Sequence, residues 1–420
     1  MIKKLLKFLD FSPNPEEIRS LKESTNELLE ELREVSKKQK LAVEFFVGGS
    51  FAKGTLMKKD VSDIDIFVRF DWRYEQLTDK LEKLILSLNK KYRVEKIHGS
   101  RDYFKISLQK SVVFELIPVL AIKHSKEARN VMDLSYFHVR YVKKHLTPAL
   151  AKEVLLAKAF CKACGVYGAE SYIRGFSGYG LECLIIHYKS FEKMLKALVK
   201  VKERLLLDPE HHYHTQEEIL YTLNEARLQS PIVLVDPTWK ERNVLAALHS
   251  ETFKKFQLVA RNFLKKPSKR FFEEKRFDLD SLQRKAKAVD AEVVHLQLTT
   301  QKQKGDIAGT TLKKFTRFLE RILSRYFQVV NQEFLYDEEQ KADVFFLLRS
   351  KKEIIIMGPP ITLKKHAIAF KKKHSGVKVK NGMLYVEKKF SFSAKIFLEA
   401  FAHEQKKRIR EMNISQMKVI

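Results

Sequence analysis

Two aspartates, Asp63 and Asp65, are separated by a single residue in a stretch where polar and apolar side chains alternate. Such alternation predicts a β-strand, on which residues two apart share a face. The two carboxylates therefore point the same way, while Ile64 and Ile66 point into the core. Paired carboxylates build a poor core, but they suit divalent metal ions, which prefer oxygen ligands. The spacing thus indicates a metal site.

A glycine-rich turn, Gly48-Gly49, lies just before this strand and is followed by Ser50 and Lys53. Glycine allows a tight turn whose backbone N–H groups approach a phosphate, and we expect a helix to start there. Downstream, the run VVFELIP predicts a strand with Glu115 on its polar face. In two-metal phosphoryl transfer, two carboxylates bridge both ions and a third binds the ion that activates the attacking hydroxyl. The alternative, three strand acids with no shared role, is disfavoured because converging carboxylates repel each other without a cation.

The composition favours a soluble protein with a polyanionic partner. The chain has 420 residues, with 80 Lys and Arg against 52 Asp and Glu, and a net charge of +28. Its hydrophobic content of 45% excludes global disorder, and three cysteines favour a reducing compartment, which we take to be the cytoplasm. No apolar run is typical of a signal peptide or a membrane span, so we expect no membrane association. A basic membrane-surface protein is the weaker alternative, because Lys and Arg are spread through the whole chain.

The elements that must position these residues form an α/β region at the N-terminus. Asn14-Pro15 and the two acids after it are typical of a helix start. We predict strands at 43–47, 63–70, 92–97, 103–108 and 112–118, and a helix at 77–88. The prediction is a small sheet with helices on one side.

The rest of the chain divides into a mainly helical part and a basic part. Up to residue 266 we predict helices, a loop at 175–180, a strand at 232–235 and a helix at 244–264. Beyond it we predict a strand at 353–357, a turn at 358–360, a Lys-rich helix to about 374, and strands at 377–380 and 383–389 joined by an Asn-Gly turn. A helix with an apolar face also carries a basic stripe that we expect to bind RNA, formed by Lys314, Arg317, Arg321 and Arg325.

The glycine turn and the two aspartates resemble those of the polymerase-β-type nucleotidyltransferases. Further motifs, spread over nearly the whole chain, resemble the archaeal CCA-adding enzymes, the class I tRNA nucleotidyltransferases. These motifs are Tyr136-Phe-His138, Ala157-Lys158, Val166-Tyr167-Gly-Ala-Glu170, Arg174-Gly-Phe-Ser-Gly-Tyr179, Asp236-Pro237, Arg242-Asn243-Val244, Gly358-Pro-Pro, His366-Ala, Phe370 and Asn381-Gly-Met-Leu-Tyr385. The resemblance implies an α+β multidomain fold: a polymerase-β-like head (1–132), a helical nucleotide-binding central domain (133–266) and a basic α+β body and tail that binds tRNA (267–420).

The resemblance also implies roles for individual residues. Two Mg²⁺ ions would be held by the catalytic residues Asp63, Asp65 and Glu115. The incoming nucleotide would be contacted by Ser50 and Lys53 at its triphosphate, by His138, Lys158 and Tyr167, and by Arg242 at its base. Two residues depart from the family. Lys53 stands where arginine is frequent and loses bidentate phosphate geometry, and Glu115 stands where aspartate is frequent and has a longer arm.

The activity implied is template-independent addition of C, C and A to the 3′ end of tRNA from CTP and ATP, with release of pyrophosphate, and hence repair of that end. Basic surface would bind the acceptor and TΨC arms by shape, and a homodimer is left open. One alternative is another template-free RNA nucleotidyltransferase of the poly(A) or oligoadenylate type. The other is a non-catalytic RNA-binding protein.

Two further groups of residues have no expected role. Cys161 and Cys164 form a lone C-x-x-C, and zinc sites need about four ligands, so we expect small semi-buried residues there. His211, His212 and His214 lie in a polar stretch that we interpret as a solvated loop.

Overall fold

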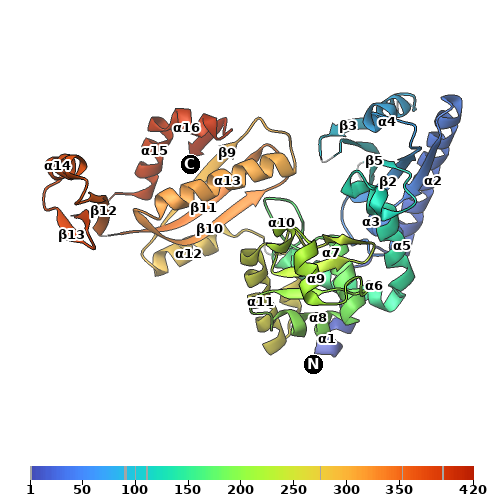
Figure 1. The fold of residues 1–420 in the computed structure, drawn as a ribbon, viewed down its shortest axis with the longest axis horizontal. Helices are drawn as coiled ribbons and strands as arrows, with labels where there is room; N and C mark the ends of the chain where they lie inside the picture. The colour runs from blue at the N-terminus through green and yellow to red at the C-terminus, as the bar shows by residue number, and fades with distance from the viewer. Residues whose placement is uncertain are drawn as a thin grey trace. The chain divides into compact units, whose positions relative to one another are not determined.

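The computed structural model describes residues 2–88, 92–99, 101–109, 112–274, 276–351, 353–389 and 392–420. The chain forms two compact units, residues 1–275 and 276–420, whose elements are labelled in Figure 1. The prediction of a separate head (1–132) and central domain (133–266) within the first unit stays a prediction. None of the helices in the described ranges is long and apolar enough to cross a membrane.

The first unit begins with a five-stranded sheet and its helices. The sheet order is β1-β2-β5-β4-β3, with β2 and β5 parallel and all other pairs antiparallel. The elements are α1 (Ile2–Lys7), α2 (Pro15–Lys38), β1 (Val43–Val47), α3 (Gly49–Ala52), β2 (Ser62–Phe70), α4 (Leu77–Leu86), β3 (Arg93–Ile97), β4 (Tyr103–Gln109) and β5 (Val112–Leu120). All five predicted strands and the helix at 77–88 are confirmed, with small shifts at their ends.

Helices α2 and α4 pack on one face of this sheet. Leu28 and Leu32 of α2 and Leu81 of α4 share a buried core with Ile64 and Ile66 of β2. Helix α2 begins where the sequence predicts it: the Asn14 side chain accepts from the Glu17 N–H at 2.7 Å, and the Glu17 carboxylate accepts from the Asn14 N–H at 2.9 Å. This capping box satisfies N–H groups that a helix start leaves without a partner, and so fixes where α2 starts.

The remainder of the first unit is mainly helical. Its elements are α5 (Ser135–His145), α6 (Pro148–Ala163), α7 (Gly178–Tyr188), α8 (Phe191–Leu198), β6 (Leu205–Leu207), α9 (Gln216–Thr222), α10 (Glu225–Leu228), β7 (Ile232–Asp236), β8 (Trp239–Asn243) and α11 (Ser250–Lys265), with short 3₁₀ turns before α5 and after α11. Phe160 lies at the centre of its core, with rings of Phe191, Phe256, Phe263 and Phe272 around it. Cys161 and Cys164 are buried and form no disulfide, where semi-buried residues were predicted.

Two predictions in this region are wrong in detail, and one strand, β8, was not predicted. The loop predicted at 175–180 ends early, because the Ser177 side chain caps α7 by accepting from the Gly180 N–H at 3.0 Å. The polar run before Asn243 is strand β8, which pairs with β7. The helix predicted at 244–264 begins only at Ser250, since the Asn243 side chain accepts from the Leu245 N–H at 2.9 Å and holds a turn there.

The second unit contains two sheets. One has the order β10-β11-β9-β15 and the other the order β12-β14-β13, and all their pairs are antiparallel. The elements are α12 (Leu279–Ala288), β9 (Glu292–Thr299), α13 (Asp306–Leu323), β10 (Phe327–Tyr336), β11 (Lys341–Ser350), β12 (Glu353–Pro360), α14 (Lys364–Lys373), β13 (Lys378–Lys380), β14 (Met383–Lys389), α15 (Ala394–Glu404), α16 (Lys406–Glu411) and β15 (Gln416–Val419).

The larger sheet carries helices on both faces. Buried residues of α13, α15 and α16 form one core with it, and α12 packs on the other face. The predicted hairpin turn is confirmed, with Asn381 and Gly382 at φ of 50° and 76°. The turn predicted at 358–360 is wrong, because β12 runs through these residues to Pro360, which pairs with Met383 after a register shift.

Candidate active site

The three predicted catalytic carboxylates lie on the adjacent strands β2 and β5. The parallel register places Asp65 directly opposite Glu115 and Asp63 opposite Val113. Ile64 and Ile66 are fully buried, whereas Asp63 and Asp65 are partly exposed. The predicted sidedness of the strand is thus confirmed, and the fold gathers the three acids at one edge of the site.

The electrostatics of these carboxylates are those of a site with too much negative charge. Burial and the charges of Glu115 and Asp63 raise the pKa of Asp65 to about 7, although Lys53 acts in the opposite direction. Burial also raises the pKa of Glu115. Carboxylates that repel one another in this way favour a nearby cation.

Two lysines supply part of that positive charge. Lys59 lies 2.6 Å from Asp63 and Lys105 lies 3.2 Å from Glu115, measured from Nζ to the carboxylate oxygen. Within the described residues, no three His, Cys, Asp or Glu side chains are arranged to hold a metal ion. The donor set nevertheless fits Mg²⁺ in its oxygen chemistry and its charge. The side chains would turn from the two lysines toward the metal.

The glycine turn lies against the carboxylates. The N–H of Gly48 donates to the carbonyl oxygen of Asp65 at 2.8 Å, which binds the turn to β2. Gly49 has a φ of 58°, and a Cβ there would lie 1.6 Å from Oδ2 of Asp65, so only glycine fits. Ser50 lies within α3, but this helix has a single turn and Lys53 follows its end, which corrects the expectation of a longer helix.

Four side chains of the first unit form what we call the buried charge cluster: Lys53, Thr55, Lys158 and Glu182. Glu182 of α7 accepts from the Lys53 ammonium at 2.5 Å, from the Thr55 hydroxyl at 2.6 Å and from the Lys158 ammonium at 3.1 Å. Burial opposes the charge of Glu182, but the two lysines outweigh it and hold its pKa at about 2. The predicted Lys53 and Lys158 are therefore brought together by an acid that was not predicted.

Tyr167 lies beside this cluster, in the segment after α6. A Cβ on Gly178 would lie 3.1 Å from the Tyr167 hydroxyl and 3.9 Å from the Lys158 ammonium. Because Gly178 has no side chain, the Tyr167 hydroxyl and the Lys158 ammonium can both lie close to the start of α7. Burial raises the pKa of Tyr167, so its hydroxyl keeps its proton and can donate a hydrogen bond.

His138 and Arg242 are joined by a second unpredicted acid, Asp236. The ring of His138 lies 3.0 Å from Asp236, and Arg242 donates to the same oxygen at 2.6 Å. Burial opposes the charge of Asp236, but His138 and Arg242 outweigh it and hold its pKa well below its usual range. His138 also stacks on Tyr179, with ring centroids 4.1 Å apart. A planar ring and a guanidinium thus face the site together.

The unpredicted acids left only weak signals in the sequence. Glu182 is a single charge in the apolar run LECLII, and a charge at such a position is rarely buried without a partner. Asp236 belongs to an Asp-Pro motif after a buried strand. Neither pattern identifies the partner, because Glu182 and Lys53 are 129 residues apart.

The predicted RNA-binding stripe lies in the second unit. Lys314 and Arg321 are exposed on α13 and Arg317 is partly exposed, while Arg325 lies beyond the last residue of the helix, Leu323. The stripe is thus confirmed as solvent-facing over most of its length, and its contact with RNA stays a prediction.

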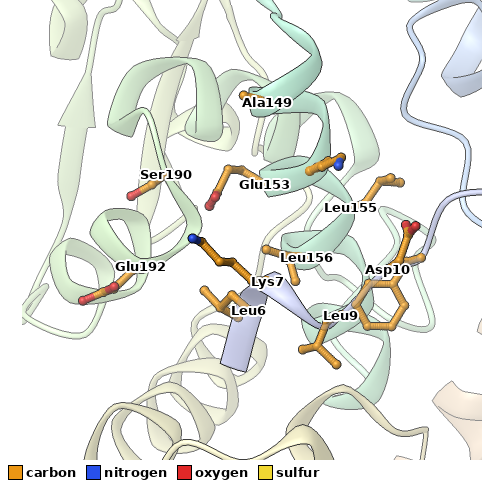
Figure 2. Close-up of a pocket in the computed structure, with 12 residues that line it drawn as sticks. Leu6, Lys7, Leu9, Asp10, Ala149, Glu153, Leu155, Leu156, Ser190 and Glu192 are labelled. Carbon is orange, nitrogen blue, oxygen red and sulfur yellow. The ribbon is translucent and has the colours of Figure 1, made fainter. Parts of the chain in front are cut away.

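A hollow of 460 Å³ lies elsewhere in the first unit, between α1 and helices α6 and α8, and Figure 2 shows its lining. Leu6 and Leu9 from the N-terminal segment face Glu153 and Leu156 of α6 across it. None of the predicted site residues lines it. Glu153 accepts from the Phe191 N–H at 2.7 Å, so this carboxylate serves the start of α8.

Comparison with protein families matches two parts of the chain. Residues 2–133 match the model of the second messenger oligonucleotide or dinucleotide synthetase domain. Residues 152–273 match the model of the second domain of tRNA nucleotidyltransferase. The sheet with its carboxylates lies in the first match, and α6, α7 and Arg242 lie in the second.

Two curated proteins are similar over longer stretches. The CCA-adding enzyme of Nanoarchaeum equitans is 37% identical over 257 residues, which are 60% of this chain and 63% of that protein. The CCA-adding enzyme of Saccharolobus islandicus is 30% identical over 306 residues, which are 72% of this chain and 69% of that protein. The chain therefore spans just under two thirds of the first relative and just over two thirds of the second.

Among solved structures, a cytoplasmic RNA terminal U-transferase has a similar fold. Its TM-score is 0.50 at 16% sequence identity, and the match covers 66% of this chain and all of that one. With the synthetase-domain match, this confirms the predicted mixed α+β fold with a polymerase-β-like nucleotidyltransferase head.

Proposed function

The chain belongs to the family of archaeal CCA-adding enzymes, and on this premise we propose that it adds C, C and A to the 3′ end of tRNA without a nucleic-acid template. CTP and ATP are the substrates and pyrophosphate is the product. The observation that carries the proposal is the register of β2 and β5, which sets Asp65 opposite Glu115 beside a glycine turn.

We assign Asp63, Asp65 and Glu115 to a divalent metal site, with Mg²⁺ as the ion and two ions as the expected number. When bound there, Mg²⁺ makes a ribose hydroxyl more acidic and stabilises a leaving pyrophosphate. Support comes from the raised pKa of Asp65, whose causes are burial and the charges of its two neighbours. Lys59 and Lys105 form ion pairs with Asp63 and Glu115, and a bound metal would take the place of these lysines beside the carboxylates.

The residues around the carboxylates bind and orient the triphosphate. The turn at Gly49 and Ser50 offers backbone N–H groups and a hydroxyl to a phosphate, and Lys53 offers an ammonium group. Lys158 adds positive charge behind Lys53, through the carboxylate that both lysines share. In the reaction, the 3′ oxygen of tRNA forms a bond to the α-phosphorus while the bond from that phosphorus to the β-phosphate oxygen breaks. The hydroxyl loses its proton, and pyrophosphate departs.

The base is recognised by the group around Asp236. Arg242 and the His138 ring, both fixed by this buried acid, present hydrogen-bond donors and a stacking face. CTP and ATP differ in ring size, so a rigid protein pocket does not accept both by shape alone. We therefore assign the remaining recognition to the RNA end itself, with Arg242 as the contact from the protein.

tRNA is bound by basic surface, through its acceptor and TΨC arms. The net charge of +28 and the exposed Lys314 and Arg321 on α13 support a phosphate-contacting surface. A-form RNA has a major groove too narrow to read, so binding by shape is expected. We place the activity in the cytoplasm, in keeping with three buried cysteines that form no disulfide.

The test is incorporation of single nucleotides into tRNA that lacks its 3′ end. We expect two C residues from CTP alone, and one A only after them. Long runs of A from ATP alone would contradict the proposal and favour a poly(A)-type enzyme. Equal activity on a minihelix of the acceptor and TΨC arms is the expected result for the tRNA contact, and loss of activity on it would contradict that part.

A further inference from the structure

The buried charge cluster has an arrangement that the proposed function does not by itself explain. Side chains from the segment after α3 and from α6 meet on one carboxylate of α7. The side chains of Glu182 and Lys158 are 0% and 2% exposed, and that of Lys53 is 10% exposed. The cluster therefore lies at the inner wall of the site, and Lys53 is its most exposed member.

The charges of the cluster do not cancel. Two ammonium groups meet one carboxylate, which leaves one positive charge in a dry place. Burial lowers the pKa of Lys158, and Glu182 acts against that loss of charge. Without an anion, buried ammonium groups lose their proton or move apart. Glu182 is thus the group that opposes the loss of charge of Lys158 and holds the two ammonium groups close together.

The hydrogen bonds leave capacity for a further anion. An ammonium group has three N–H donors, and within the described residues the Lys53 ammonium donates only to Glu182. Lys158 donates to the carbonyl and hydroxyl oxygens of Thr55 and to Glu182, at 3.0, 3.0 and 3.1 Å. Lys158 is therefore fully satisfied and fixed, whereas Lys53 retains donors for a phosphate.

We propose that Glu182 is a positioning residue for the triphosphate, which holds the Lys53 ammonium in place while leaving it donors for a phosphate oxygen. This inference rests on the proposed function and extends it to a residue that touches no substrate. It also explains how lysine serves where arginine is frequent in the family. An ammonium group can bond a carboxylate and a phosphate at once, and the carboxylate fixes its direction.

The experiment compares Glu182→Gln with the wild-type full chain in binding CTP and CMP, measured by calorimetry. Gln keeps the shape of Glu but removes the charge. We expect the Kd for CTP to rise by about tenfold or more, and the Kd for CMP to change by less than about twofold. Glu182→Asp, which keeps the charge on a shorter arm, is expected to recover part of the CTP affinity.

The matched control is Asp133→Asn. Asp133 is also fully buried in the first unit and pairs with Arg101, away from the cluster. A merely structural role for Glu182 predicts that both variants lose stability and that neither changes the ratio of the CTP and CMP Kd values. An equal change in the two Kd values for Glu182→Gln, or no change in either, would overturn the proposal.

Two further outcomes are covered by the design. If Glu182→Gln does not fold, Glu182→Asp alone is decisive: an unchanged ratio of the CTP and CMP Kd values in it contradicts the proposal.

The binding readout is also independent of CCA addition. A wild-type chain that binds CTP over CMP but adds no CCA contradicts the proposed function and leaves Glu182 open to the same test, while one that shows no preference for CTP overturns the inference itself.

Discussion

The carboxylate edge and the buried charge cluster solve opposite electrostatic problems within one unit. At the edge, like charges are set close together, and burial with these neighbours raises the pKa of Asp65 to about 7. In the cluster, one acid is placed between two lysines, which hold the pKa of Glu182 at about 2. In the first region, Lys59 and Lys105 pair with Asp63 and Glu115 but the pKa of Asp65 stays raised, whereas in the second region the lysines outweigh the burial of the acid. One part of the site depends on its ligand, and the other is organised in advance.

The largest effect that tests this comparison is expected for Asp65→Asn. Nucleotide addition should fall by roughly a hundredfold to a thousandfold, because the variant loses a charged ligand at the centre of the site. The metal-free variant should nevertheless be at least as stable as the wild type in urea, since the change removes a repelling charge. Glu44→Gln, an acid on β1 outside the site, is the control for activity. A large loss of stability in Asp65→Asn would contradict the comparison, because it would show that groups of the protein already stabilise the charge of Asp65 without a metal.

The next effect concerns stability against pH, where the two regions should respond in opposite directions. The pKa of Glu182 lies below its usual 4.5, so its contribution is present above pH 4.5 and lost as pH falls toward 2, on the order of 3 kcal/mol in total. The pKa of Asp65 lies above its usual 3.8, so the metal-free protein should lose stability as pH rises from about 4 to 7.

Urea unfolding across this pH range, with the metal removed by a chelator, measures both effects. Glu182→Gln should flatten the acid limb of the curve and Asp65→Asn the limb between pH 4 and 7. If Glu182→Gln leaves the acid part of the curve of unfolding free energy against pH unchanged, the lowered pKa of Glu182 is contradicted. If Asp65→Asn leaves the part between pH 4 and 7 unchanged, the raised pKa of Asp65 is contradicted.

The smallest effect is stabilisation by metal. Mg²⁺ at about a hundred times its Kd should stabilise the wild type by about 3 kcal/mol, and less at pH 5, where protons compete for the carboxylates. Thermal unfolding with and without Mg²⁺ measures this at both pH values. Asp65→Asn should show little response, while Glu182→Gln should respond like the wild type. An equal stabilisation of the two variants by Mg²⁺ would contradict the assignment of the metal to the carboxylates and not to the buried charge cluster.

The sequence predicted the parts of the site that depend on local patterns. Strand β2 and the capped start of α2 follow from alternation and from the Asn-Pro-Glu-Glu run, which act over a few residues. Strands β9, β10 and β11 were not predicted, although they pair over most of their length. Strand β9 alternates apolar and polar residues from Val294 to Leu298, which is a strand signal that the prediction missed. The apolar run in β11 does not distinguish a buried strand from a buried helix by periodicity.

The contacts between distant residues could not be predicted from the residues alone. Lys53 was expected to face a triphosphate, but its partner Glu182 lies in another helix far along the chain. Lys59 and Lys105 beside Asp63 and Glu115 are likewise visible only in three dimensions. A sequence indicates which charges need partners, and the fold decides which partners they find.

Gly49 and Asp65 cannot diverge independently. Even alanine at position 49 would place a methyl group 1.6 Å from the carboxylate oxygen, and the φ of 58° adds strain for any side chain. We therefore expect substitutions at position 49 and position 65 to be coupled during evolution. A library randomised at both positions and selected for growth should return glycine at 49 wherever it returns aspartate at 65.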